Sequence, residues 1–144
     1  MTNEIRACVE QKQVLLTKIL SLSRQIKDQC NQLDKTDPSA LINQRQIYLN
    51  RLKKCMDRIA QLAAKLPPQE QERMDMILSA QSPKPACTPA ESQLWEIEAK
   101  CRSLLHEICS CDAESKKKMK EECQRLRKLV NDTRNKSTSN TLYF

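Results

Sequence analysis

The stretch IRACVEQKQVLLTKILSLSRQIKDQCNQL, residues 5–33, decides the fold of this chain. Its seam positions recur three and four residues apart, which places their side chains along one face of an α-helix. These positions are Ile5, Cys8, Lys12, Leu15, Ile19, Leu22, Ile26, Gln29 and Leu33. The pattern predicts a long amphipathic helix from about residue 3 to residue 34.

A second stretch with the same spacing follows a short turn. Its seam positions are Leu41, Arg45, Tyr48, Leu52, Cys55, Ile59, Leu62 and Leu66. Asp37 is placed to cap this helix, and Pro38 to occupy its first position, where no amide proton is needed. Pro67 and Pro68 end it, because the residue before a proline disfavours helical geometry. The short connection between the two helices predicts an antiparallel hairpin.

A third long helix is predicted to begin at Thr88-Pro89-Ala90-Glu91, which is a capping box with proline at the first helical position. Its seam shifts after Asp112, so the helix either continues or breaks between Cys111 and Lys118. A short helix is predicted over residues 69–80. The expected organisation is a hairpin with this short helix at 1–80, a proline-rich linker at 81–89, a C-terminal helix packed on the hairpin at 90–136, and a tail at 137–144.

The chain has 144 residues and no glycine, where average usage would give about ten. Glycine is the usual residue of hairpin turns, phosphate-binding loops and helix C-caps, so its absence disfavours β-rich folds and glycine-built active sites. No nucleophile or carboxylate has an obvious orienting partner in the sequence. We therefore predict an all-α bundle of three long amphipathic helices and one short helix that is not an enzyme.

Charge and hydropathy indicate where the protein works. The net charge is +7, and nine basic residues against three acidic ones lie between Lys116 and Lys136. We expect this stretch to be a solvated helix face that steers an acidic partner, because aromatic residues are only 3% of the chain and no nucleic-acid-binding motif is present. Without a signal peptide or a membrane span, the expected location is the cytoplasm, with no membrane insertion and with the eight cysteines reduced.

The densest group of potential metal ligands lies on the third long helix. Its members are Cys101, His106, Cys109, Cys111 and Asp112. On a single helix these side chains point in several directions, whereas a zinc site needs converging ligands, normally paired from two elements. No metal site and no cofactor is therefore predicted.

Residues for partner binding are expected on the same helix. Trp95 lies beside the seam position Leu94 and is a large side chain suited either to the core or to anchoring a partner. The full set of predicted partner-binding residues is Trp95, Arg125, Leu126, Arg127, Lys128 and Val130.

Two parts of the chain resemble flagellar type III export chaperones. The segment LINQRQIYLNRL, residues 41–52, is similar to the arginine-centred second helix of these proteins. LLHEIC at 104–109, DAE at 112–114, TRNK at 133–136 and the terminal Tyr143 resemble the closing helix of the filament-cap (FliT-like) chaperones and, less closely, of the hook-junction (FlgN-like) chaperones. The chain departs from that pattern in having Asn135 where a glycine is common, and in its eight cysteines.

The resemblance implies a function. Such a chaperone masks an amphipathic helix of an export substrate and delivers it to the export apparatus, and its last helix both contacts partners and folds back over the groove. The alternatives are a coiled-coil interaction protein that oligomerises, including as a homodimer, and a nucleic-acid-binding helical protein.

Overall fold

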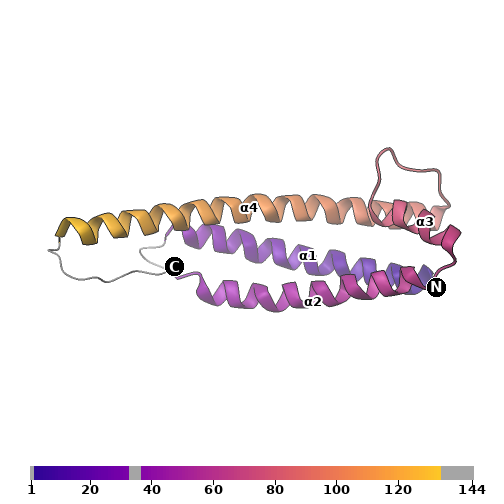
Figure 1. The fold of residues 1–144 in the computed structure, drawn as a ribbon, viewed down its shortest axis with the longest axis horizontal. Coiled ribbons are helices and arrows are strands. Elements are labelled where there is room, and N and C mark those ends of the chain that lie inside the picture. The colour runs from indigo at the N-terminus through magenta and orange to yellow at the C-terminus, as the bar shows by residue number, and fades with distance from the viewer. Residues whose placement is uncertain (1, 33–36, 134–144) are drawn as a thin grey trace.

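The computed structural model describes residues 2–32 and 37–133, except for the side chains of residues 2 and 130–133. Within these ranges the chain forms four helices and no strand (Figure 1). They are α1 (Thr2–Cys30), α2 (Ser39–Ala64), α3 (Pro68–Leu78) and α4 (Pro89–Thr133). The predicted all-α bundle of three long helices and a short one is confirmed.

Helix α1 is the central helix, and it packs against α2 on one side and α4 on the other. α2 runs antiparallel to α1, as the short connection predicts, and α4 runs parallel to α1 (Figure 1). The backbones of α2 and α4 do not approach each other closely. The three long helices therefore form a layer in which only the middle helix, α1, is covered by a long helix on two sides.

The side chains predicted to form the seam of α1 do form its buried face. Ile5 and Ile19 are completely buried, and Leu15, Leu22 and Ile26 nearly so. Lys12 and Gln29 are half-buried, and Leu33 lies outside the described residues. Burial of aliphatic side chains on both flanks of α1 is the main source of stability, because each such side chain contributes about 1.5–3 kcal/mol.

The core has two clusters along α1. The first joins the beginning of α1 to the end of α2, to α3 and to the beginning of α4, and its members include Ile5, Val9, Leu62, Met74, Ile77 and Leu94. The second joins the middle of α1 to α4, and α2 contributes partly buried side chains; its members include Leu16, Ile19, Leu20, Cys101, Leu104 and Ile108.

The start of α4 follows the predicted capping box, whereas the start of α2 is shifted by one residue: Pro38 takes the N-cap position predicted for Asp37, and Ser39 is the first helical residue. The Thr88 amide donates to Glu91 Oε1 at 2.9 Å and the Glu91 amide donates to Thr88 Oγ1 at 3.2 Å, which confirms the capping box. The Asp37 carboxylate accepts hydrogen bonds from the amide and the hydroxyl of Ser39 at 3.0 and 2.7 Å, and these bonds lower the pKa of Asp37. Pro68 lies at the first turn of α3, the position that tolerates proline.

The end of α3 has the hydrogen bonds of a Schellman motif. The Ala80 amide donates to the Ile77 carbonyl at 3.0 Å, and the Gln81 amide donates to the Met76 carbonyl at 3.2 Å. In this motif the residue at the position of Ala80 adopts left-handed geometry, and Ala80 has a φ of 51°. A chain without glycine thus ends this helix with a residue whose Cβ disfavours that geometry.

Helix α4 runs without a break through residues 111–118, so of the two predicted alternatives the helix continues. Its 45 residues correspond to about 67 Å of length, against about 43 Å for the 29 residues of α1. α4 therefore extends past the ends of α1 and α2 (Figure 1), and Ser115 is the last buried residue among its described side chains. The predicted residues 134–136 of this helix and the tail at 137–144 lie outside the described residues.

None of the four helices, as far as the described residues extend, combines the length and the apolar character needed to cross a membrane.

Candidate functional site

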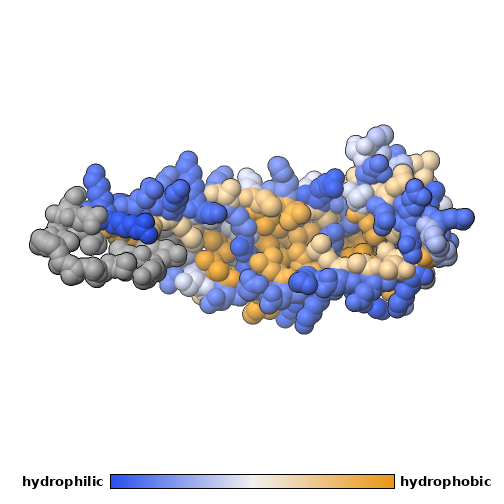
Figure 2. Space-filling view, viewed as in Figure 1, coloured by the Kyte–Doolittle hydropathy of each residue, from blue (hydrophilic) through white to orange (hydrophobic). Residues whose placement is uncertain are grey.

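An apolar groove runs along the face of the molecule between α2 and α4, with α1 as its floor. Its floor is the second core cluster, on which Leu49 and Leu52 of α2 lie half-buried. Leu105 of α4 is 50% exposed and Met56 of α2 is 47% exposed, so apolar side chains also form the rims. Figure 2 shows this as a hydrophobic band along the middle of the molecule, bordered by hydrophilic surface.

Helical spacing assigns Leu105 to the groove. It lies seven residues after Glu98 and seven before Asp112, a separation of nearly two helical turns, so all three side chains share one face of α4. Glu98 lines a pocket together with α2 residues, and Asp112 contacts Arg45 of α2. The face of α4 that looks toward α2 is therefore the one that carries Leu105.

A buried ion pair lies in the groove near its α3 end. Lys12 Nζ is 3.1 Å from Glu98 Oε1 and 3.3 Å from Oε2. The Glu98 side chain is only 3% exposed and that of Lys12 19%. Burial raises the pKa of Glu98, and the nearby Lys12 ammonium only partly offsets this. The pair joins α1 to α4 under the groove.

A second polar cross-link lies toward the other end of the groove. Nη1 of Arg45 donates to Asp112 Oδ1 and to Ser23 Oγ, the latter at 3.0 Å. Ser23 is fully buried on α1, so one guanidinium from α2 connects all three long helices. Glu98 and Asp112 are fourteen residues apart on α4, which places about 21 Å of groove between the two cross-links.

At the α3 end the groove deepens into a pocket of about 410 Å³. Its wall on α2 is apolar, with Ile59, Ala60 and Ala63, and its floor includes the Lys12–Glu98 pair. Leu78 of α3 closes one side. Gln71 and Asp75 of α3 complete the lining, so the pocket combines an apolar wall with polar groups.

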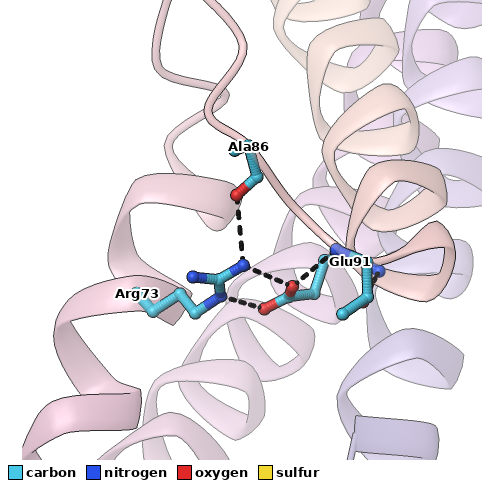
Figure 3. A network of polar contacts seen from close by, with 4 residues as sticks. Arg73, Ala86 and Glu91 are labelled. Atoms are coloured by element: carbon cyan, nitrogen blue, oxygen red, sulfur yellow. Dashed lines mark hydrogen bonds and ion pairs between the residues drawn. The ribbon is translucent and has the colours of Figure 1, made fainter.

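The position of α3 beside this pocket is held by a salt-bridge network at the start of α4 (Figure 3). The Arg73 guanidinium donates to both Glu91 carboxylate oxygens, at 2.6 and 2.9 Å, and to the Ala86 carbonyl at 3.1 Å. These bonds, with those from Thr88, lower the pKa of Glu91 to about 2. The sequence pattern identified Glu91 as a capping residue, but its bond to Arg73 depends on tertiary structure.

Burial favours the protonated form of three cysteine thiols. Burial raises the pKa of Cys101 to about 11, and burial also raises the pKa of Cys55 and Cys30. A protonated thiol is a poor nucleophile and a poor metal ligand. These cysteines therefore serve as small apolar side chains of the core.

The potential metal ligands of α4 do not come together. Cys101 and Cys111 are buried in the bundle, whereas His106 and Cys109 are exposed, and Asp112 is engaged by Arg45. Over residues 2–32 and 37–133, no three His, Cys, Asp or Glu side chains are arranged to hold a metal ion.

The predicted partner-binding residues lie at two distant places on α4. Trp95 is half-buried against the first core cluster, and its Nε1 donates to the Gln81 carbonyl at 3.0 Å, so it ties the linker to α4. Leu126 is half-buried and lies about 46 Å along the helix from Trp95. The remaining residues of the set are near Leu126: Arg125 pairs with Glu122, Arg127 and Lys128 are exposed, and the side chain of Val130 lies outside the description.

Leu105, Lys12 and Glu98 are functional candidates that the sequence pattern alone did not identify as site residues. Charged residues at seam positions, Lys12 and Arg45, were the available signal, because a charge on an apolar stripe needs a buried partner. The identity of that partner depends on how the helices are arranged in space.

Comparison with known proteins returns no matching family model, no matching curated protein and no matching solved structure.

Proposed function

We propose that this protein is a non-catalytic helix-binding protein whose groove between α2 and α4 receives the apolar face of an amphipathic helix from a partner protein. The observation that carries the proposal is the open apolar band over α1, with exposed Leu105 and Met56 on its two rims. The three long helices α1, α2 and α4 occupy three positions of a four-helix bundle, and the fourth position, over this band, is empty. A partner helix with apolar residues every three or four positions fills it.

The similarity of residues 41–52 and 104–114 to flagellar export chaperones supports a specific partner. Under this proposal the groove shields a terminal amphipathic helix of an export substrate in the cytoplasm, and the complex is then delivered to the type III export apparatus. The length of groove between the two polar cross-links, about 21 Å, corresponds to about four turns of a partner helix. The basic end of α4 orients an acidic partner, because exposed charges affect orientation and association rate more than affinity.

The test uses labelled peptides with the sequences of terminal helices from filament-cap and hook-junction proteins, with binding followed by fluorescence anisotropy. Leu105→Lys places a charge on the rim of the groove and is expected to weaken binding about tenfold or more. Val14→Lys is the matched control, because Val14 is 61% exposed on the outer face of α1. Circular dichroism confirms that both variants remain helical.

Three results contradict the proposal. One is equal binding by the wild type and Leu105→Lys. A second is a melting temperature that rises with protein concentration in the wild type but not in Leu105→Lys. This result would mean that a second copy of the chain occupies the groove, and the oligomerising alternative would then be correct. Binding lost equally in Val14→Lys and Leu105→Lys also places the peptide elsewhere.

A further inference from the structure

A second furrow lies on the other side of α2, between its outer face and α1. It contains a pocket of about 460 Å³. Its floor is apolar and includes Ala7 and Leu15 of α1, and its α2 side carries Arg51, Lys54 and Arg58. No carboxylate lines it.

The three cations are on one stripe of α2. They are three and four residues apart, so they project along the same face over about 10 Å. The whole of α2 has five basic residues and a single acidic one, Asp57. Asp57 is already paired with Lys53, 3.2 Å away. The helix therefore has no carboxylate left to neutralise this stripe.

Several cations on the surface of the bundle pair with carboxylates, whereas those of this stripe do not pair with any carboxylate in the part of the chain that the structure describes. Arg6, Arg24 and Lys27 on α1 each pair with a carboxylate. In the part of the chain that the structure describes, neither Lys54 nor Arg58 has an ion-pair partner. Arg51 lies over the ring of Tyr48, with its guanidinium carbon 5.2 Å from the centroid, and it forms no ion pair among the described residues.

The positive stripe continues past the pocket. Lys18 of α1 lies over the same Tyr48 ring, with Nζ 5.8 Å from its centroid. Lys18 and Arg51 thus both lie near the Tyr48 ring, and Ile47, which is exposed, precedes Tyr48 on α2. The surface combines an apolar floor with four cations along its length.

We infer that the furrow between α1 and α2 binds an acidic amphipathic segment of a partner protein, whose carboxylates pair with Arg51, Lys54 and Arg58 while its apolar side chains cover Ala7 and Leu15. The argument is charge complementarity, since this surface has an excess of positive charge and no internal carboxylate to neutralise it. The surface is separate from the groove of the proposed function, because Leu105 and the pocket with Glu98 lie between α2 and α4.

An acidic peptide fits this furrow better than a nucleic acid does. Phosphate backbones bind cations without covering an apolar floor, and single-stranded nucleic acids need exposed aromatic rings on which bases stack. The one ring here, that of Tyr48, is already covered by Lys18 and Arg51. The apolar floor fits the apolar side chains of a helical peptide. The three- and four-residue spacing of the cations fits carboxylates at the same spacing on that peptide.

The experiment measures binding of a labelled helical peptide of about 15 residues with glutamates at three- and four-residue spacing and leucines beside them. A control peptide has glutamine in place of each glutamate. We expect the acidic peptide alone to bind, with an affinity that falls as salt rises. The variant Arg51→Gln/Lys54→Gln/Arg58→Gln is expected to weaken binding about tenfold or more, because three charge pairs are lost.

The matched control removes the same charge elsewhere. Arg24→Gln/Lys100→Gln/Arg102→Gln changes three exposed cations of α1 and α4 that line neither the furrow nor the groove, and it is expected to leave binding within about twofold of the wild type. Equal loss in the two triple variants means attraction by net charge alone and overturns the inference. A single-stranded oligonucleotide is tested in the same way. If it binds more tightly than the peptide, and the α2 triple variant loses this binding, the inference is overturned and the furrow binds a nucleic acid.

A further variant separates this inference from the proposed function. Leu105→Lys is expected to leave binding of the acidic peptide unchanged, since the two surfaces are distinct. If Leu105→Lys abolishes that binding, the peptide occupies the α2–α4 groove, and the second site is wrong while the helix-binding function stands. If the α2 triple variant loses the acidic peptide but retains the flagellar peptides, both proposals are supported.

Discussion

Ala80 is the residue whose conformation is least suited to its side chain. It takes the left-handed position of a Schellman motif with a φ of 51°, where a Cβ costs about 1–2 kcal/mol. We expect Ala80→Gly to raise the free energy of unfolding by about 0.5–1 kcal/mol, since part of the gain is offset by the greater freedom of glycine in the unfolded chain. Urea denaturation measures this, with Ala113→Gly at an exposed position in the interior of α4 as the control that is expected to be destabilising.

Glu91 is a residue whose ionisation is coupled to folding. Its pKa is about 2 in the folded chain against an ordinary value of 4.5, mainly because of the Arg73 guanidinium. Its stabilising contribution is therefore complete above about pH 4.5 and is lost as the pH falls from there through about 2. We expect the urea midpoint of the wild type to fall more steeply over this range than that of Glu91→Gln. Glu72→Gln, at an exposed position of α3, is expected to leave the wild-type slope unchanged.

At the scale of single helices, α1 and α2 differ in how much their seams are covered. Ile19 of α1 is completely buried, whereas Leu52 of α2 is half-buried at the groove. We expect Ile19→Ala to lower the free energy of unfolding by about 2–5 kcal/mol and Leu52→Ala by about 1–2 kcal/mol. Chemical denaturation of the two variants tests this. Equal losses would mean that the groove is closed in solution.

Much of this helical architecture could be predicted from particular residues. The three- and four-residue spacing from Ile5 to Ile26 identified α1, and Thr88 with Glu91 identified the start of α4, because both signals are local. The course of α4 beyond Asp112 stayed open, since the shift of its seam is compatible with a break or with a helix leaving its neighbours. The structure shows the second outcome, in which α4 continues past the end of α1.

At the scale of the whole molecule, the groove could not be predicted, because it depends on which helix lies in the middle. Helical spacing shows that each long helix has an apolar face, but not that α1 is covered on both sides while α2 and α4 stay apart. Leu105 follows the buried Leu104 in the sequence, and only the arrangement of the rods shows that one is core and the other a groove rim. The partner-binding residues predicted at the far end of α4 remain a prediction.

The open groove gives the whole molecule a testable response to a bound helix. A peptide that occupies the groove binds the folded chain and not the unfolded one, so it stabilises the fold by mass action. At a free concentration of about 100 times its Kd, we expect the free energy of unfolding to rise by about 2.7 kcal/mol. Thermal melting with increasing peptide measures this shift. Unchanged melting at saturating peptide would show that binding does not involve the folded bundle.

The guanidinium of Arg45 also determines the longitudinal alignment of the three rods. Aliphatic seams alone permit a helix to slide by one turn, about 5.4 Å, because one leucine replaces another at the interface. Such a slide would carry Arg45 away from both Ser23 and Asp112 and leave its largely buried guanidinium without these two partners. The three long helices consequently have one favoured axial alignment. The α2 rim and the α4 rim of the groove therefore keep the same position relative to each other when a partner helix binds.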